Sequence, residues 1–318
     1  MARLLFGVNV PTSAAPGTDP VSYARRAEEV GFDFVSASDH PCGTNPSYET
    51  WTMLSLIAAA TSRIKVATRV LGVPYRSPAM VAKMAETLDR LSEGRLILGM
   101  GGGYSDEEFH AFGLRVPSPK EKIEGLEEAV RIVRGLWSEP TFTYEGQHHR
   151  TIAADLEPKP QHDIPIWLGT FGKRSLAVTG RVADGWIPSL SVAPPNEIPK
   201  MRDRIAAAAE EVGRNPQKIT FVYNIEVRID TTTDRNPHVV SGSPEAVADQ
   251  LRSLVELGLG GMNLMPVGPN LDEQLERLGA DVIAPLRDHW SRSGRTEARH
   301  QRRWTCDTSG HIDAPRSG

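Results

Sequence analysis

Short apolar runs alternate along the chain with longer segments in which apolar residues recur every three or four positions. Short apolar runs are typical of buried strands, and the longer period is typical of amphipathic helices. The predicted strands are 4–10, 32–38, 64–71, 95–100, 164–170, 184–189, 219–229 and 261–267. Each is followed by a predicted helix, at 20–31, 52–62, 77–92, 106–112 with 120–137, 174–183, 197–213, 243–258 and 271–290.

This alternation predicts the fold class. Eight strand–helix units in roughly 290 residues indicate an α/β protein with a parallel (β/α)8 TIM barrel, because a doubly wound sheet usually has fewer units. The barrel is expected to occupy residues 1–290. Its periodicity breaks at about 138–162, where TFTYEGQHH is typical of a hairpin, and we interpret this stretch as an inserted excursion. Residues 291–318 are polar and basic, and we expect a disordered tail.

Composition narrows the class of function. With 39% hydrophobic and 24% charged residues, the 318-residue chain is typical of soluble globular proteins. Its net charge of −4 gives no reason to expect a nucleic acid or an anionic membrane as partner. No apolar run is long enough to span a bilayer, and the start of the chain does not resemble a signal peptide. Only Cys42 and Cys306 are present, so no disulfide framework and no metal site is expected. A cytoplasmic enzyme for a small molecule is the default expectation.

Functional groups of such a barrel lie where the strands end and the following loops begin. In this chain those positions are 9, 39–40, 69–73, 101–104, 169–175, 187–188, 224–226 and 265–266.

The loop after the fourth predicted strand contains Gly101, Gly102 and Gly103. It is not a dinucleotide fingerprint, because Tyr104 takes the place of the third glycine of that motif, and no GK[ST] phosphate loop follows. Adjacent glycines let a flat ligand approach the backbone without Cβ atoms in the way. A turn that needs positive φ angles would use glycine as well, so the loop alone leaves both interpretations open.

A second glycine-containing loop, WLGTFGKRS, joins a predicted strand to a predicted helix. Free amides at a helix N-terminus bind phosphate, and here they belong to Gly172, Lys173, Arg174 and Ser175. Two basic side chains at this end oppose the helix dipole, and a bound anion would resolve that conflict. We therefore favour an anion site over a solvated helix start.

Asp39 and His40 close the second predicted strand. A histidine at a strand end can act as a general acid or base, because its ordinary pKa of ~6.5 lies near neutral pH. The neighbouring aspartate would orient the imidazole or bond a ligand N–H group. Arg69, at the end of the third predicted strand, is either a ligand contact or, more simply, a charge at the barrel rim.

Together these segments resemble the bacterial luciferase-like superfamily, in particular its coenzyme F420-dependent oxidoreductase branch. The resemblance is carried by VSASDH, by RIKVATRVLGVPYRSPAMVAKMAETLDRLSEGRLILGMGGGY, by PIWLGTFGKRSLAVTGRVADGW and by GSPEAVADQLRSLVELGLGGMNLM, and it spans about residues 4–288. It implies a luciferase-like barrel with an insertion, which is usually dimeric and holds a flavin or deazaflavin at its carboxyl-end mouth.

The resemblance also assigns roles to residues. It places a non-prolyl cis peptide at Arg69–Val70 behind the ring, ring contacts at Gly72 and Val73, and a bond to the polar edge of the ring at Asp39. It places the phosphate at the turn formed by Phe171, Gly172, Arg174 and Ser175, where the helix-dipole argument also places an anion. The residues implied as cofactor-binding are Asp39, Arg69, Val70, Gly72, Val73, Gly101, Gly102, Gly103, Phe171, Gly172, Lys173, Arg174 and Ser175.

The catalytic residues match the family only in part. His40 coincides with the catalytic histidine of the sugar-phosphate dehydrogenases of this branch, where a glutamate of the glycine loop and a tryptophan accompany it. Tyr104 and Thr44 stand at those two positions here. We therefore expect an incomplete catalytic pair, a proton-donating or carbonyl-binding role for Tyr104, and a substrate other than glucose 6-phosphate.

Three hypotheses of function follow. The first is an F420-dependent oxidoreductase that moves a hydride between the deazaflavin C5 and a small organic substrate, with His40 and Tyr104 handling the proton. The alternative is a monooxygenase that uses reduced FMN and O2. A third is a non-catalytic partner subunit, although the glycine loops and the Asp39–His40 pair argue against it. A homodimer is expected in the enzymatic cases.

Overall fold

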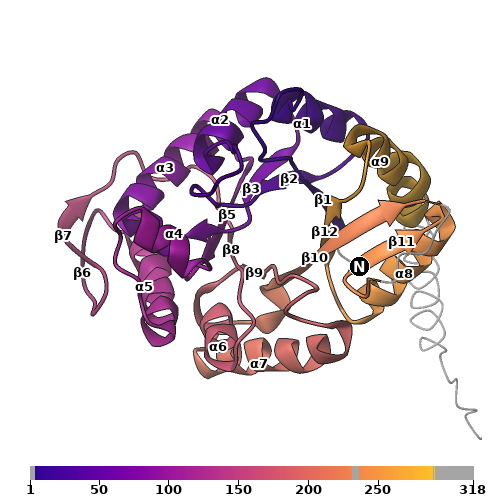
Figure 1. Cartoon of the computed structure of the whole chain (residues 1–318). Helices are drawn as coiled ribbons and strands as arrows, with labels where there is room; N and C mark the ends of the chain where they lie inside the picture. Colours follow the sequence, from indigo (N-terminus) through magenta and orange to yellow (C-terminus); the bar gives the residue numbers. More distant parts are fainter. Residues whose placement is uncertain (1–3, 231–235, 289, 291–318) are drawn as a thin grey trace, which may run out of the picture.

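The computed structural model describes residues 4–230, 236–288 and 290, and within them eight parallel strands close into a barrel (Figure 1). In barrel order they are β1 (Leu5–Asn9), β2 (Phe34–Ala37), β3 (Lys65–Thr68), β5 (Leu96–Gly101), β8 (Ile166–Leu168), β9 (Gly185–Trp186), β10 (Thr220–Ile229) and β12 (Gly261–Pro266), which pairs with β1. The predicted (β/α)8 barrel is confirmed.

Helices surround the barrel, and several of them begin with a side-chain cap. They are α1 (Pro20–Glu29), α2 (Thr50–Ala60), α3 (Pro78–Leu91), α4 (Asp106–Ala111), α5 (Pro119–Ser138), α6 (Lys173–Val182), α7 (Ile198–Glu211), α8 (Pro244–Glu256) and α9 (Leu271–Arg277). Ser118 and Glu121 form a reciprocal capping box at α5, and the Ser243 side chain caps α8. Such caps satisfy amides that the helix itself leaves without acceptors.

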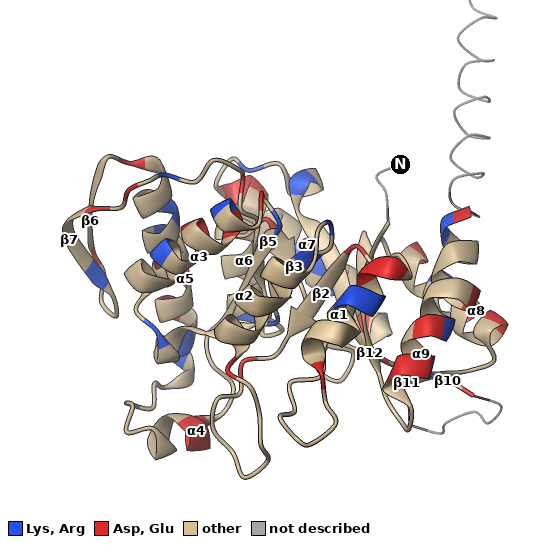
Figure 2. Ribbon diagram, turned by 90° about the horizontal axis from the view of Figure 1, so that it is seen from above, with Lys and Arg blue, Asp and Glu red and all other residues tan. Residues whose placement is uncertain are grey.

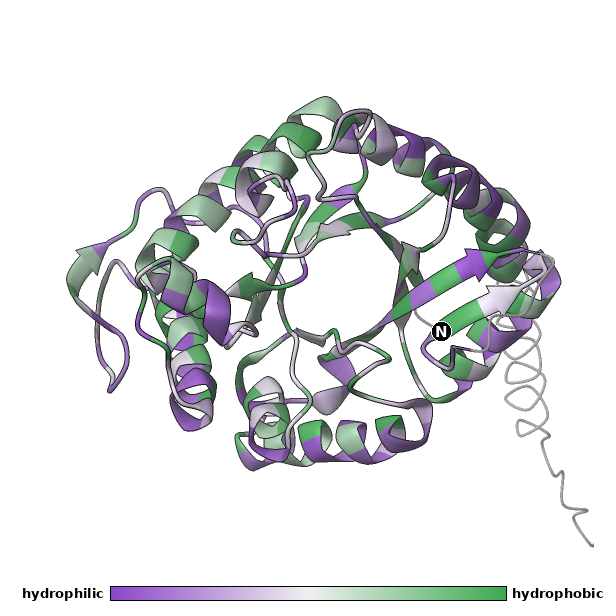
Figure 3. Ribbon diagram, in the orientation of Figure 1, coloured by the Kyte–Doolittle hydropathy of each residue, from purple (hydrophilic) through white to green (hydrophobic). Residues whose placement is uncertain are grey.

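The core has two layers because successive strand residues point to opposite faces. Inside the barrel, Phe34, Trp167 and Val222 belong to a compact apolar plug. The outward faces of the strands pack against the apolar stripes of the helices, as the green positions in Figure 3 show. Removing each large apolar side chain from water stabilises the fold by ~1.5–3 kcal/mol, so the plug contributes to the stability of the barrel.

The structure differs from the predicted elements at two strands. The third predicted strand ends early, at Thr68, and a short strand β4 (Leu71–Gly72) then pairs with β5, followed by a 3-10 turn, η1 (Val73–Tyr75). A strand that was not predicted, β11 (Val239–Gly242), lies parallel to the far end of β10. β10 has ten residues, which is longer than a typical barrel strand, and its last part runs to the rim of the barrel. β11 pairs only with this last part, and the sequence pattern of a regular barrel therefore did not predict it.

The excursion is a two-stranded antiparallel hairpin, β6 (Thr141–Glu145) and β7 (Arg150–Asp155), which confirms the predicted hairpin. Its turn is held on α5 by one carboxylate, because Glu128 accepts hydrogen bonds from the amides of Gln147, His148 and His149. The predicted tail at 291–318 lies outside the described residues. In the described part of the chain, no helix combines the length and the apolar character needed to cross a membrane.

Candidate active site at the carboxyl end of the barrel

The loops that follow the parallel strands gather at one end of the barrel, where α4 with its acidic residues stands out from the rest of the fold (Figure 2). Because all eight strands are parallel, the predicted site residues at their carboxyl ends are brought to this one end. They form three groups: a polar cluster around Asp39 and His40, a glycine-lined wall around Val70, and the open start of α6.

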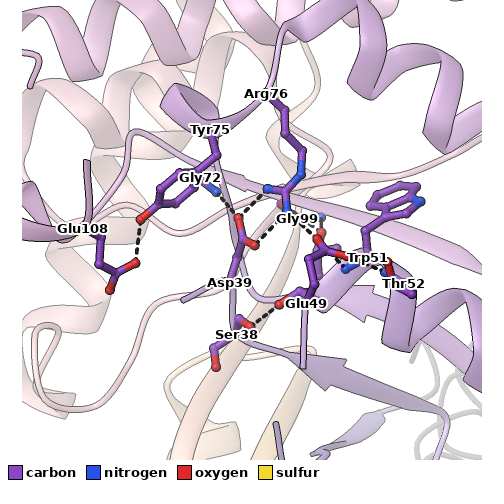
Figure 4. Close-up of polar contacts among 12 residues, drawn as sticks. Ser38, Asp39, Glu49, Trp51, Thr52, Gly72, Tyr75, Arg76, Gly99 and Glu108 are labelled. Carbon is purple, nitrogen blue, oxygen red and sulfur yellow. Dashed lines mark hydrogen bonds and ion pairs between the residues drawn. The ribbon is translucent and has the colours of Figure 1, made fainter. Parts of the chain in front are cut away.

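Asp39 anchors the polar cluster (Figure 4). Its buried carboxylate accepts two hydrogen bonds from Arg76, at 2.7 and 3.1 Å, and a third from the Gly72 amide at 3.0 Å. A paired guanidinium and an amide compensate the cost of burying this charge. Asp39 therefore fixes the chain just after the third strand. Its predicted bond to the polar edge of a cofactor ring would use the carboxylate lone pairs that these three contacts leave free.

Arg76 extends the cluster to a second carboxylate, that of Glu49, at 2.6 Å. Glu49 also caps α2 by accepting hydrogen bonds from the Trp51 and Thr52 amides. Partial burial opposes ionisation of Glu49, but these hydrogen bonds and Arg76 outweigh it and lower the pKa of the carboxyl group. The start of α2 and the loop after β2 are thereby tied to one another.

His40 lies at the exposed side of the cluster and has a carboxylate partner. Its Nδ1 is 2.8 Å from Oε1 of Glu108, while Oε2 of Glu108 accepts a 2.6 Å hydrogen bond from the Tyr75 hydroxyl. Burial and this hydrogen bond raise the pKa of Tyr75, which keeps the hydroxyl protonated as a donor. The second ring nitrogen of His40, Nε2, has no hydrogen-bond partner among the described residues.

Glu108 bears on one prediction. The tyrosine at position 104 led us to expect an incomplete catalytic pair, but a carboxylate from the first turn of α4 contacts His40. The catalytic role of this pair stays a prediction. Tyr104 itself is 82% exposed and stands edge-on to the His40 ring, with 6.4 Å between the centroids. Its proposed contact with a substrate stays a prediction.

The peptide bond between Arg69 and Val70 is cis, which confirms the position predicted from the resemblance. The Val70 side chain lies over Gly101 and Gly169, where added Cβ atoms would come within 2.7 and 3.1 Å of its methyl groups. Gly99 meets the Thr68 carbonyl in the same way. Gly72 and Val73, which follow the cis bond, are buried.

Two further glycines of the loop are also explained by the protein's own packing. A Cβ on Gly102 would lie 2.8 Å from the Lys122 carbonyl oxygen of α5. Gly103 has a φ of 92°, and a Cβ on it would lie 2.4 Å from the Phe109 ring. These contacts account for the glycines without a ligand, and their predicted contact with a flat ring stays a prediction.

The second glycine-containing loop presents an open helix start. Phe171, Gly172, Lys173 and Arg174 are exposed, and no carboxylate among the described residues pairs with either cation. Ser175 is turned back, accepting from the Gly172 amide at 3.1 Å and donating to its carbonyl. The first intrahelical bond runs from Leu176 to Gly172. The amides of residues 173–175 are thus the free donors of a helix N-terminus.

Sequence reasoning missed four members of the polar cluster: Glu49, Tyr75, Arg76 and Glu108. Each stands in a predicted loop or helix start where charged and aromatic residues are common, so no local pattern distinguishes it. The one available signal was the position of Glu108, three residues after the capping Ser105, which directs it toward the loop side of α4. Among the described residues, no cluster of His, Cys, Asp and Glu is arranged to hold a metal ion.

Comparison with known proteins gives a consistent family. The model of the luciferase-like monooxygenase family matches residues 4–236. An F420-dependent glucose-6-phosphate dehydrogenase of Nakamurella multipartita is 31% identical over 72% of this chain and 69% of its own length. That of Kineococcus radiotolerans is 34% identical over 86% and 94%. The structure of an F420-dependent secondary alcohol dehydrogenase, 20% identical, superposes over 90% of this chain and 99% of its own with a TM-score of 0.81, which shows a shared fold.

Proposed function

The chain belongs to the luciferase-like monooxygenase family, and on that premise we propose that it is an oxidoreductase that uses coenzyme F420 to transfer a hydride to or from a small organic substrate. The likeness to two dehydrogenases named for this coenzyme, at 31% and 34% identity, carries the choice of cofactor. The pairing of His40 with Glu108 beside the barrel mouth supports the choice of chemistry.

The residues at the barrel mouth fit such a cofactor. The free amides of residues 173–175 offer donors for its phosphate, and Lys173 and Arg174, which pair with no carboxylate of the described residues, offer positive charge. The ring would lie against Val70, whose side chain is only partly buried. When bound, the cofactor supplies C5 of its deazaflavin ring as the carbon that accepts or donates the hydride.

His40 is the residue we propose to handle the proton. A hydroxyl that becomes a carbonyl as its carbon loses a hydride must also lose a proton, and a carbonyl reduced to a hydroxyl must gain one. Glu108 holds Nδ1, so Nε2 is the nitrogen that would exchange this proton with the substrate oxygen. Glu108 is itself held by Tyr75, which makes both of them positioning residues for the imidazole.

The substrate is a small molecule with a hydroxyl or carbonyl group. With Glu108 in contact with His40, the argument against glucose 6-phosphate now depends on Thr44, an exposed residue where the sugar-phosphate dehydrogenases have a tryptophan. A threonine offers a sugar ring less surface for stacking than a tryptophan does. We therefore keep a different hydroxyl or carbonyl compound as the proposal, and glucose 6-phosphate is the first compound to assay.

Titration of the purified protein with coenzyme F420, followed by fluorescence, tests the proposal. We expect saturable binding and a substrate-dependent change in the absorbance of the deazaflavin. Absence of binding would contradict the choice of cofactor.

The family name also fits a second candidate, a monooxygenase that uses reduced FMN and O2. This candidate predicts oxygen consumption with an FMN reductase and no response to coenzyme F420. The same protein sample, assayed with both cofactors, distinguishes the two functions.

We also propose that the protein is a homodimer that associates through α2 and α3. These helices border a groove of about 320 Å3, and α2 is apolar on nearly every side. Leu56, Met80 and Leu91 are 61, 56 and 79% exposed on the same two helices. Exposed apolar side chains in such a group are typical of an interface. The cytoplasmic location expected from the sequence stays a prediction.

A further inference from the structure

The floor of the barrel mouth is a polar layer directly above the apolar plug. Ser36 donates a 2.9 Å hydrogen bond to Asn263, and Asn263 donates a 2.7 Å bond to Asn224. Ser36 also lies 3.4 Å from Asn9, its neighbour across the β1–β2 register. All four groups are neutral, so the layer contains polar donors and acceptors but no formal charge.

Arg69 adds one positive charge to this neutral floor. Its Nε donates a 3.2 Å hydrogen bond to Oδ1 of Asn9, and within the described ranges 4–230, 236–288 and 290 it has no carboxylate partner. Arg76 and Arg287, which are also partly buried, are paired with Asp39 and Asp33. Among the described residues Arg95 and Arg202 have no such pair, but they donate to backbone carbonyl groups of the protein. Burial lowers the pKa of Arg69 to about 10, which reflects the unfavourable desolvation of a cation without a counter-charge.

The remaining nitrogens of Arg69 are available to a ligand. Nη1 and Nη2 of Arg69 have no hydrogen-bond acceptor among the described residues. Neither atom is sealed from solvent, so both can be reached by a ligand. The residue is only partly buried. A guanidinium with two open nitrogens in one plane presents a fork that matches a planar group with two acceptor atoms, such as a carboxylate.

The opposite wall of the mouth carries an acidic side chain. In the barrel order, β10 lies four strands from β3, across the barrel. Glu226 shares the alternation of Val222, in the plug, and Asn224, in the floor, so it points into the barrel. Glu226 repels a ligand anion and Arg69 attracts it. An anionic group is therefore favoured on the Arg69 side of the mouth.

We propose that the Arg69 guanidinium binds a planar anionic group of a small-molecule ligand at the floor of the barrel mouth. The group has one of two sources: a carboxylate of the substrate, or the carbonyl-bearing edge of the cofactor ring as it gains negative charge on reduction. The inference deepens the proposed function, but the binding of a simple carboxylate to the cofactor-free protein tests it separately.

The first experiment titrates the cofactor-free protein with benzoate and with neutral benzamide by calorimetry. Wild type is expected to bind benzoate more tightly than benzamide. Arg69→Gln should weaken benzoate binding about tenfold or more, because a charge-assisted bidentate pair is lost. Arg69→Lys should give an intermediate affinity, since it keeps the charge without the fork. Arg150→Gln removes an exposed charge from the distant hairpin and is the matched control.

Equal benzoate affinity in wild type and Arg69→Gln would overturn the proposal, as would equal affinities of wild type for benzoate and benzamide. Thermal unfolding of each variant establishes that it is folded, and Arg69→Lys supplies the comparison if Arg69→Gln is not.

A second titration, with a deazaflavin that lacks the phosphate tail, identifies the source of the anion. If Arg69→Gln weakens binding of the reduced deazaflavin together with benzoate, the cofactor ring supplies the group. If deazaflavin binding is unchanged while benzoate binding is lost, the substrate supplies it. Failure of the wild type to bind any deazaflavin contradicts the proposed function alone, because the benzoate result does not depend on the cofactor.

Discussion

Nδ1 of His40 lies 2.8 Å from Oε1 of Glu108, 68 positions further along the chain. The contact joins the loop after β2 to the first turn of α4, and the Tyr75 hydroxyl holds the other carboxylate oxygen. An imidazole fixed at one nitrogen presents the other in a defined direction. This relationship suits the exposed His40 to the proposed role of a base or acid.

His40→Gln should lower kcat by about 100-fold or more while the dissociation constant for coenzyme F420 stays unchanged, because the proton acceptor is lost and the cofactor contacts are not. Steady-state kinetics and fluorescence titration measure the two quantities. His110→Gln, which changes an exposed histidine of α4, is the control.

Within the same set, Glu108→Gln is expected to reduce kcat more than it changes KM, since it misplaces the imidazole without removing it. Glu108→Asp should restore part of the loss. Full activity in both Glu108→Gln and His40→Gln would contradict the proposed role of this pair in proton transfer.

The start of α6 provides a second prediction. Replacing both Lys173 and Arg174 by Gln should weaken binding of coenzyme F420 about tenfold at low salt, because charge-assisted bonds to its phosphate are lost. Binding of a phosphate-free deazaflavin should stay at the wild-type value. Fluorescence titrations with the two ligands provide the measurement, and equal losses for both would place the phosphate elsewhere.

Gly99 allows a prediction about stability. A Cβ at this position would collide with the Thr68 carbonyl, which is backbone and is held in the β3–β5 pairing. Gly99→Ala should therefore lower the free energy of unfolding by about 2 kcal/mol or more in urea denaturation. Gly260→Ala is the matched control, since its nearest contact is an ordinary 3.7 Å. An unaltered midpoint for Gly99→Ala would show that the strands separate easily at this point.

Glu128 gives a prediction that depends on pH. Burial opposes its ionisation, but hydrogen bonds from the His148, His149 and Gln147 amides lower the pKa of its carboxyl group. A lowered folded-state pKa contributes stability above the unfolded value of ~4.3, and this contribution is lost as the pH falls through the folded value. Glu128→Gln should therefore lower the free energy of unfolding by about 2 kcal/mol at neutral pH and by much less in acid.

Urea denaturation of this variant at neutral pH and at acidic pH makes the comparison. Glu145→Gln, an exposed carboxylate of the same hairpin, should behave as wild type at both. A loss for Glu128→Gln that is the same at the two pH values would mean that charge contributes little to the hairpin anchor.

The proposed dimer is tested by charge at its apolar surface. Leu56→Glu and Leu91→Glu should each convert the protein to a monomer, because a desolvated carboxylate would have to be buried between α2 and α3 of two copies. Light scattering after gel filtration measures the mass. Val212→Glu, on an exposed side chain at the end of α7, is the control. A monomeric wild type would contradict the proposal directly.

Local patterns in the sequence determined the architecture. Apolar runs, helical periodicity and caps such as Ser243 depend only on neighbouring residues, so the order of strands and helices was predictable. The same holds for the open helix start at Lys173, which one loop and one helix define. The position of the cis bond at Arg69–Val70 came from the family resemblance.

Only the tertiary structure decided which side chains meet at the mouth. Glu108 and Tyr75 reach His40 because the parallel strands bring their loops to one end, and no local pattern records that distance. The same holds for the glycines, whose missing Cβ atoms make room for Val70, α5 and Phe109. Arg69 looked like an ordinary rim charge until its surroundings showed a cation without a counter-charge. Contacts between distant segments depend on how strands close into a barrel, and that is a property of the whole chain.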